Sequence, residues 1–199
     1  MKAGELDLDD RQIMQRVQAG EHELFNRLAE RYQDRLWRFA ASKLCDATRA
    51  EDVVQEALLA AFASRHTYDR GFAFSTWLWS ILVNLCRREM RGRRRRPTEL
   101  SNSVFAGRSQ PRRAERVHCE GGLSQLLLAE RREQVTALLG ELPDVQADAL
   151  RLRFYGELQY DEIARTMNCS VSGAKRRVRT GLLALARKLD ESGQRGEKP

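Results

Sequence analysis

Residues 74–96 read FSTWLWSILVNLCRREMRGRRRR, and the organisation of the whole chain follows from this stretch. Apolar residues recur in it at the spacing of a helix that packs one face against a core: Trp77, Leu78, Ile81, Leu82 and Leu85. Ser75 is placed to cap the first turn by accepting a backbone N–H. Because the helix runs on into a block of arginines, it is either a core helix with a solvated basic tail or a helix that reads nucleic acid.

The basic charge of the chain is concentrated at the end of this helix. The 199 residues carry a net charge of +7, and residues 87–96 alone hold seven arginines and one glutamate, a local balance of +6. A patch of this kind favours a polyanion, because binding releases condensed counterions. The charge pattern therefore points to a nucleic-acid partner.

Composition predicts a protein of one or two small domains, with 42% hydrophobic and 32% charged residues. We expect a cytoplasmic location, because the sequence has no run of eighteen apolar residues and residues 1–7 lack the apolar core of a signal peptide. The scattered cysteines are expected to be reduced thiols: Cys45, Cys86, Cys119 and Cys169. His118–Cys119 is an adjacent pair of soft ligands with no second pair at ligand spacing, so neither a metal nor another cofactor is expected.

Two helices are expected before residue 46. Asp9 or Asp10 can cap a short first helix that ends at Gly20, and a longer helix runs from about Glu21 to Leu44 with apolar residues at helical spacing.

A third helix follows, opened by a capping box in which Thr48 and Glu51 satisfy each other's free amides. Its outward face carries Glu51, Asp52, Gln55 and Glu56, an acidic patch in a basic protein. The patch is either a solvated helix start that complements the helix dipole or a docking face for a basic partner.

The loop before residue 74 combines aromatic and cationic side chains, Tyr68, Arg70 and Phe72. Such loops beside a basic helix can stack unpaired bases.

Composition changes after Arg96. Residues 97–122 hold two of the four prolines, three glycines and almost no apolar periodicity. We interpret residues 97–123 as a flexible linker, which ends a first domain at residue 96.

The helical pattern resumes at residues 123–142 and again at 144–155, after Pro143. Two helices then follow in quick succession, at 161–167 and 171–189, with a turn at Asn168–Cys169 and Ser170 as cap; Gln159 stands before the first. This spacing predicts a helix-turn-helix, with a structural helical hairpin as the alternative. The second helix presents Ser172 and a row of cations outward, as a helix in the major groove requires: Lys175, Arg176, Arg177 and Arg179.

The expected fold class is thus all-α, with two small helical domains, residues 1–96 and 124–189, joined by a flexible linker. Residues 190–199 are expected to be a disordered tail.

Three sets of motifs stand out together: AEDVVQEA at 50–57; FSTWLWSI at 74–81 with Asn84; and LPDVQ at 142–146, YDEIA at 160–164 and SVSGAK at 170–175. In this order and spacing they resemble the extracytoplasmic-function group of the sigma-70 family, the dissociable promoter-specificity subunits of bacterial RNA polymerase. The resemblance covers residues 10–96 and 124–189. The chain departs from the family pattern at Gly173–Ala174, where Thr-Val is favoured, and at Gln159, where a Ser or Thr cap is common.

The resemblance implies a role for each surface. Core polymerase would be bound, through the clamp helices of its largest subunit, by Asp52, Gln55 and Glu56. The −10 element would be recognised and melted by Tyr68, Arg70, Phe72, Asn84, Arg87, Arg88 and Arg91. The −35 element would be read as duplex by Ser170, Ser172, Lys175, Arg176, Arg177 and Arg179. Further implied partners are the flap of the second-largest subunit and an anti-sigma factor, and the linker would thread toward the RNA exit path.

Two other classes of function remain open. A helix-turn-helix regulator would bind duplex DNA without core polymerase, but it needs no acidic helix followed by a Trp/Asn/Arg helix. An enzyme would need clustered carboxylates or histidines, whereas His22, His66 and His118 lie far apart in the sequence, so no catalytic residue is assigned.

Overall fold

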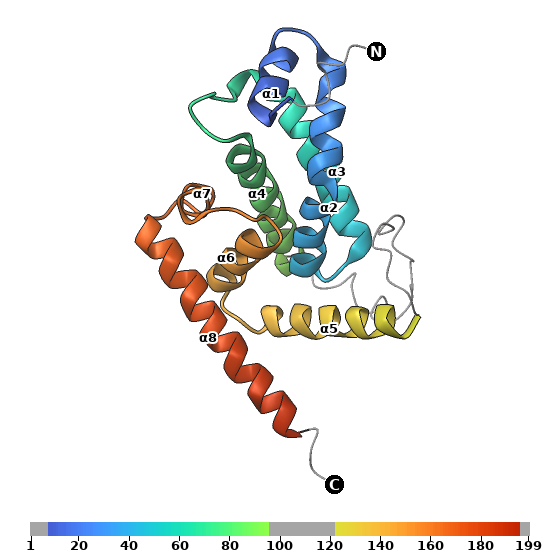
Figure 1. Ribbon diagram of the computed structural model, residues 1–199, viewed down its shortest axis with the longest axis vertical. Coiled ribbons are helices and arrows are strands. Elements are labelled where there is room, and N and C mark those ends of the chain that lie inside the picture. The colour runs from blue at the N-terminus through green and yellow to red at the C-terminus, as the bar shows by residue number, and fades with distance from the viewer. Residues whose placement is uncertain (1–7, 96–121, 196–199) are drawn as a thin grey trace.

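The computed structural model describes residues 8–95 and 122–195, and it confirms the all-α fold class. Within these residues the chain forms eight α-helices and two short 3₁₀ turns, and no strand. Helices α1–α4 make an N-terminal domain and α5–α8 a C-terminal domain (Figure 1). The expected linker, residues 97–123, lies almost wholly outside the described residues.

The N-terminal domain is a bundle in which α2 packs against α3 and α4, with α1 laid across one end. Its elements are α1 (Asp10–Gln18), a 3₁₀ turn (His22–Leu24), α2 (Phe25–Leu44), α3 (Ala47–Ala63), a second 3₁₀ turn (Arg65–Thr67) and α4 (Phe74–Arg95). Every α-helix contributes fully buried apolar side chains to one core, among them Ile13, Leu28, Leu36, Phe39, Val54, Leu78 and Trp79. Burial of these side chains removes apolar surface from water and holds the bundle together.

The buried stripe of α4 differs from the one the sequence predicts. Leu78 and Leu82 are buried as predicted, but Trp77, Ile81 and Leu85 are only partly buried. Trp79, Val83 and Cys86, which were not predicted, complete the buried positions from the second turn onward. The reason is that α4 contacts α2, α3 and also α7, so its packed surface is wider than one stripe. Trp79 meets Phe39 of α2 edge to face, with ring centroids 5.5 Å apart.

Two predicted helix caps are wrong. The cap of α3 is Asp46, two residues before Thr48, and its carboxylate accepts the Arg49 N–H at 3.1 Å. Cys45 ends α2 in the left-handed region at φ 52°, which turns the chain and places Asp46 at the start of α3. Because α4 begins at Phe74, Ser75 lies inside its first turn and is not the cap residue, and its hydroxyl donates to the Glu162 carboxylate at 2.9 Å.

The C-terminal domain consists of α5 (Gly122–Gly140), α6 (Asp144–Phe154), α7 (Tyr160–Thr166) and α8 (Val171–Arg195). Helices α6 and α7 pack on α8, and their buried residues include Leu150, Leu152, Leu158, Ile163, Met167, Ala174 and Val178. Helix α8 continues to Arg195, past the predicted end at Leu189 and into the segment expected to be a disordered tail.

The predicted helix-turn-helix is confirmed in α7 and α8. Asn168 makes the turn at φ 49°, a left-handed conformation that Asn tolerates. Ser170 caps α8, its hydroxyl accepting the Gly173 N–H at 3.1 Å. The Glu162 carboxylate accepts the Gln159 N–H at 2.8 Å, so a side chain of α7 itself closes the start of that helix.

Helices α6 and α8 cross at Gly181. A Cβ placed there would lie 2.9 Å from Cδ1 and 3.1 Å from Cγ of Leu150, a side chain that is only 2% exposed. The absence of a side chain at Gly181 therefore permits the close crossing.

We predict that Gly181→Leu lowers the free energy of unfolding of the C-terminal domain by about 1–3 kcal/mol, because it overpacks this crossing. Gly92→Leu is the matched control, since a Cβ at Gly92 meets nothing within 4 Å and Leu forms helix better than Gly by up to about 1 kcal/mol. Urea unfolding followed by circular dichroism measures both. Equal stability of the two variants would contradict the packing argument.

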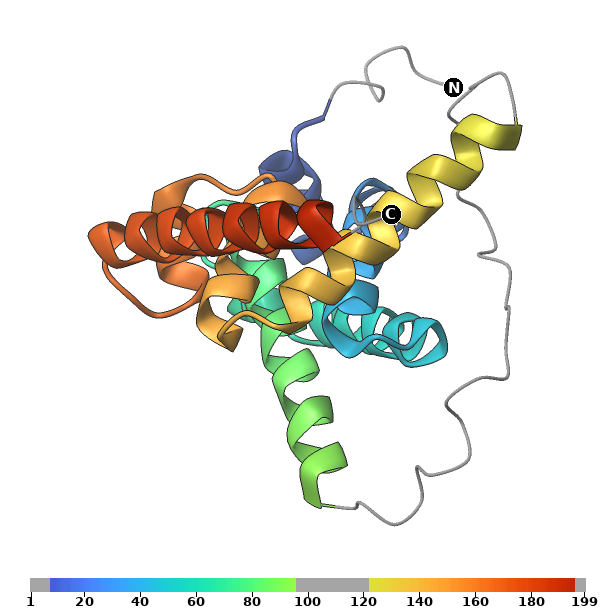
Figure 2. The ribbon, with the colours of Figure 1, turned by 90° about the horizontal axis from the view of Figure 1, so that it is seen from below.

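The two domains are in direct contact. Helix α5 passes beneath α2, α6 also reaches α2, and α7 lies against α4 (Figures 1 and 2).

Candidate polymerase-docking and nucleic-acid surfaces

The acidic residues of α3 form an outward face. Asp52, Gln55 and Glu56 are all exposed, while Val53 and Val54 on the other side of the helix are buried. The helix register therefore separates a core face from a polar face, as the sequence predicts.

Leu59 completes this face, and the sequence analysis missed it. Its side chain is 70% exposed, more than that of any other large apolar residue whose burial the structure describes. It follows Gln55 and Glu56 by four and three positions and Asp52 by seven, so all four share one side of α3. The spacing of seven residues between Asp52 and Leu59 could have shown from the sequence that Leu59 lies on the acidic side of the helix. We call the four residues the α3 face.

An ion pair ties the α3 face to α4. The Arg88 guanidinium donates to both carboxylate oxygens of Glu56, at 2.6 and 2.7 Å. Nearby, Arg49 of α3 pairs with Glu89 of α4 at 2.9 Å. Residues expected to serve two different partners, Glu56 and Arg88, therefore hold each other in this structure.

The loop before α4 is anchored by its aromatic residues. Tyr68, expected to contact DNA, is only 4% exposed and packs on Phe74 and Trp77, with ring centroids 5.9 and 5.5 Å away. Its hydroxyl donates to the Phe72 carbonyl at 2.8 Å, and burial raises the pKa of Tyr68, so it stays a neutral donor. Tyr68 thus supports the loop, and Phe72, 44% exposed, offers the open aromatic surface.

Gln18 of α1 holds the same loop from the other side. Its amide nitrogen donates to the carbonyls of Arg65 and Tyr68 at 2.9 and 3.1 Å, and its oxygen accepts from Arg70 at 3.3 Å. Arg70 itself remains exposed.

The remaining expected −10 residues line the outer side of α4. Asn84, Arg88 and Arg91 are exposed and follow one another at four and three positions, so they share one stripe. Arg87 lies beside them, 38% exposed, and pairs with Asp148 of α6 at 3.7 Å. Figure 2 shows this end of α4 projecting from the body of the molecule.

Helix α8 carries a cationic face. Ser172, Lys175, Arg176 and Arg179 are exposed at i, i+3, i+4 and i+7 and therefore line one side. Arg177 is half-buried on the flank, so it does not belong to this outward row.

Two of the expected −35 residues, Lys175 and Ser170, make contacts within the helix-turn-helix. Lys175 lies over the Tyr160 ring, 5.8 Å from its centroid, and the Ser170 hydroxyl is occupied in capping.

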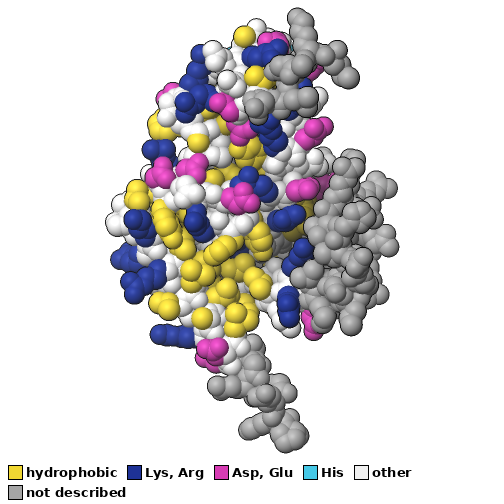
Figure 3. All heavy atoms as spheres, viewed as in Figure 1, with side chains coloured by type: hydrophobic (Ala, Val, Ile, Leu, Met, Phe, Trp, Pro, Cys, Tyr) yellow, Lys and Arg dark blue, Asp and Glu magenta, His cyan; other side chains and the backbone are white. Residues whose placement is uncertain are grey.

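Apolar side chains gather on a different part of the C-terminal domain. Figure 3 shows them over α6 and α8, bordered by Lys and Arg. Large apolar residues exposed on these helices include Val145, Leu182 and Leu183, at 46%, 42% and 53%. Exposed apolar patches are uncommon on soluble proteins and are typical of interaction sites.

Three further features of the described residues concern metal binding, membrane insertion and thiol reactivity. Within residues 8–95 and 122–195, no group of three or more His, Cys, Asp or Glu side chains could hold a metal ion. No helix in this part of the chain is long and apolar enough to cross a membrane. Burial raises the pKa of the Cys86 thiol to about 12, which keeps it protonated and unreactive.

Two family descriptions match the sequence. Residues 28–96 match Sigma-70 region 2, and residues 132–185 match Sigma-70, region 4. The chain is 32% identical over 178 residues to the ECF RNA polymerase sigma-E factor of Escherichia coli strain K12, spanning 86% of this chain and 89% of that protein. It is 30% identical over 176 residues to the RNA polymerase sigma-H factor of Pseudomonas aeruginosa, spanning 85% and 88%.

Two solved structures share the fold. CnrH, solved with the cytosolic domain of CnrY, superposes with a TM-score of 0.67 at 23% identity, covering 92% of this chain and 97% of that one. The sigma factor RpoE of Bartonella quintana, solved with the anti-sigma factor NepR, gives a TM-score of 0.63 at 24% identity, covering 83% and 96%.

Proposed function

We propose that this chain, which belongs to the extracytoplasmic-function group of the sigma-70 family and is an RNA polymerase sigma factor, divides its work among three surfaces. The observation that carries the proposal is their coexistence in one chain: the α3 face, the stripe on α4 with its preceding loop, and the cationic row on α8. A regulator that binds duplex DNA by itself needs only the last of these, so that alternative is not favoured. On this proposal the chain acts in the cytoplasm and carries out no bond chemistry.

The α3 face is the proposed site for core polymerase. Its two carboxylates suit a basic helical partner such as the clamp helices of the largest subunit. Leu59, one turn beyond Gln55 on the same side of α3, adds an exposed apolar side chain of the kind that can anchor a protein interface.

We predict that Leu59→Ala weakens binding to core polymerase by about 1–2 kcal/mol, roughly tenfold in Kd, through loss of this anchor. Stability should change little, because the side chain is 70% exposed in the free protein. Fluorescence anisotropy of labelled protein titrated with core polymerase measures the affinity. Gln33→Ala, an exposed truncation on α2 outside all of the proposed surfaces, is the control for loss of exposed side-chain area. If Leu59→Ala bound core polymerase as tightly as wild type, Leu59 would not be part of the interface.

The loop and the outer stripe of α4 are the proposed −10 site. Phe72 offers a ring for an unstacked base, and Asn84, Arg88 and Arg91 offer an amide and cations along the strand. Melting would be driven by stacking, which contributes about 1–3 kcal/mol for each unpaired base.

The outward row of α8 is the proposed −35 site. Its cations can contact phosphates and guanine edges in the major groove, while Ser172 lies near the start of the helix, where recognition helices approach the bases.

The apolar surface of α6 and α8 is the proposed site for the flap of the second-largest subunit. An anti-sigma factor is a further proposed partner, supported by the anti-sigma complex of the Bartonella quintana structural neighbour. We also propose the domain limits 1–96 and 124–189, supported by the two matched regions.

Reconstitution with core polymerase tests the proposal. Run-off transcription on a genomic promoter library, followed by 5′-end mapping, should yield transcripts that begin at shared −10 and −35 sequences. Binding of duplex DNA without any transcript would instead indicate a regulator that acts without polymerase.

A further inference from the structure

Helix α1 lies outside the part of the chain that matches Sigma-70 region 2, but it contacts the loop of the proposed −10 site. The match begins at residue 28, whereas α1 ends at Gln18. The side-chain amide of Gln18 bonds to Arg65, Tyr68 and Arg70, which lie in or just before this loop. Helix α1 is therefore a candidate part of the −10 site.

The Gln18 amide is held in one orientation. Its nitrogen donates to the carbonyl oxygens of Arg65 and Tyr68 at 2.9 and 3.1 Å, which uses both N–H groups of the amide. If the amide were turned over, its oxygen would face these two carbonyl oxygens, and no proton would lie between them. The two carbonyls therefore direct the Gln18 oxygen toward Arg70.

This oxygen engages one edge of the Arg70 guanidinium. Nε and Nη2 of Arg70 each lie 3.3 Å from Oε1 of Gln18. A guanidinium carries five N–H donors in a planar fork, so the N–H groups on its other edge can meet another acceptor. Because Arg70 is exposed, that acceptor can be a phosphate or the edge of a base. Gln18 thus fixes the plane of the guanidinium without covering it.

The backbone that carries Arg70 is fixed as well. The Asp69 carbonyl accepts the Phe72 N–H at 3.1 Å, and the Asp69 carboxylate accepts the Gly71 N–H at 2.8 Å. These bonds make residues 69–72 a tight turn with Arg70 and Gly71 in its centre. The remaining freedom of Arg70 is that of its long side chain, and the contact with Gln18 restricts it.

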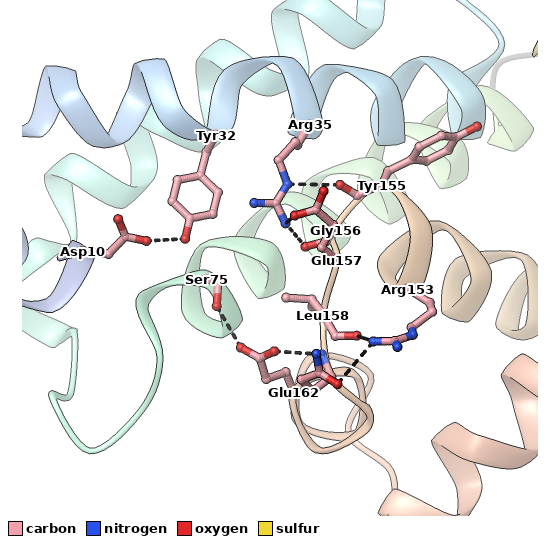
Figure 4. Close-up of polar contacts among 11 residues, drawn as sticks. Asp10, Tyr32, Arg35, Ser75, Arg153, Tyr155, Gly156, Glu157, Leu158 and Glu162 are labelled. Atoms are coloured by element: carbon pink, nitrogen blue, oxygen red, sulfur yellow. Dashed lines mark hydrogen bonds and ion pairs between the residues drawn. The ribbon is translucent and has the colours of Figure 1, made fainter.

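Helix α1 is a firm support for Gln18. Its completely buried side chains belong to the core of the N-terminal domain: Ile13, Met14 and Val17. At the start of the helix, the Asp10 carboxylate accepts the Tyr32 hydroxyl of α2 (Figure 4) and pairs with Arg31 at 2.8 Å. Burial and the Asp10 carboxylate raise the pKa of Tyr32, so the phenol stays a neutral donor. Helix α1 is thus joined to α2 at one end and to the loop at the other.

We propose that α1 is part of the −10 site and that Gln18 is a positioning residue, which holds the Arg70 guanidinium in the orientation that meets the strand. The role rests on the proposed −10 site. Gln18 acts through Arg70, because its own donors and acceptor are already bonded within the protein. Its contribution is preorganisation, since Arg70 is ordered before the strand arrives.

Two variants remove the amide, Gln18→Met and Gln18→Leu. Neither new side chain has an N–H donor, and both residues favour helix about as well as Gln does. The matched control is Gln15→Met, the same change three positions earlier on α1, where the side chain is exposed. Circular dichroism and titration with core polymerase check that each full-length variant folds and forms holoenzyme. If one variant of Gln18 loses helix, the other carries the test.

Binding of the −10 strand by the reconstituted holoenzyme measures the positioning. The probe is a fluorescent single-stranded oligonucleotide carrying the non-template −10 sequence mapped by run-off transcription, at one fixed salt concentration. Both variants of Gln18 should bind about three- to tenfold more weakly than wild type, the factor expected when one long side chain must be ordered on binding. Gln15→Met should bind as wild type does. Wild-type affinity in both variants of Gln18 would overturn the proposal.

A double-variant cycle with Arg70→Ala distinguishes positioning of Arg70 from general support of the loop. Once Arg70 has been replaced, Gln18→Met should weaken binding further by no more than about twofold, which is the resolution of such a cycle. A second full loss in the Arg70→Ala background would show that Gln18 does not act through Arg70, and this result would overturn its role as a positioning residue.

The −35 duplex provides a second ligand for the same holoenzymes. A variant that only destabilised the chain would lose affinity for both ligands, whereas loss of a positioning residue in the −10 site should affect the strand alone. Equal losses on the two ligands would overturn the proposal. Run-off transcription by the wild-type holoenzyme tests the proposed function separately, so that function would stand if the variants of Gln18 bound the strand normally.

Discussion

Replacing Asp52, Gln55 and Glu56 together with alanine is expected to weaken binding to core polymerase by about 3 kcal/mol, more than a hundredfold in Kd. The three side chains are exposed and turned away from the core, so the folded chain should be nearly unaffected. Their loss removes two carboxylates that a basic partner would pair with, and such pairs across an interface carry much of its specificity. Anisotropy titration with core polymerase measures the change, and thermal unfolding checks the fold.

The chain offers a closely matched control for this variant. Glu30, Gln33 and Asp34 on α2 repeat the same arrangement of acid, glutamine and acid at i, i+3 and i+4, and all three are exposed. Their triple alanine variant changes net charge equally but leaves the α3 face intact. If both triple variants lost the same affinity for core polymerase, the loss would come from overall charge. The α3 face would then not be the docking site.

Arg176→Ala and Arg179→Ala are each expected to weaken binding of the −35 duplex by about 1–3 kcal/mol if the side chain reaches a base edge. Both residues lie on the outward row of α8, so the double variant should lose most sequence-specific affinity. The measurement compares a duplex carrying the mapped −35 element with a scrambled duplex. An equal loss on both duplexes, with a shallower dependence on salt, would mean that the arginines contact phosphates instead.

Two arginines on the same helix serve as references. Arg177 is half-buried on the flank of α8. Its truncation to alanine should therefore weaken binding of the −35 duplex less than truncation of Arg176 or Arg179. Arg187 is exposed farther along the helix, beyond the helix-turn-helix, and its truncation should affect neither duplex.

Local features of the fold were predictable because they depend on neighbouring residues. The period of apolar residues set the helices, and the tolerance of Asn168 for a left-handed backbone placed the turn before α8. The acidic side of α3 followed from its register alone.

Features that depend on distant parts of the chain were not predictable. Tyr68 has the residue type of a stacking platform, but Phe74 and Trp77 bury it. The buried surface of α4 was predicted only in part, at Leu78 and Leu82, because the sequence does not show that α2, α3 and α7 all contact that helix. Lys43 and Asp148 resemble ordinary surface charges, and nothing near either of them in the sequence identifies its partner.

The distance along the chain between Lys43 and Asp148 has a consequence for synthesis. The two residues pair at 2.5 Å across the two domains but are 105 positions apart in the sequence, so Lys43 is made well before its partner. At about 5–20 residues per second, the ribosome needs roughly 5–20 s to reach Asp148 after Lys43. The N-terminal domain ends with α4 at Arg95, so for roughly the second half of that interval its whole sequence has been made while its covering domain has not. A nascent chain is thus the first form of this protein that a strand of DNA or a competing partner meets.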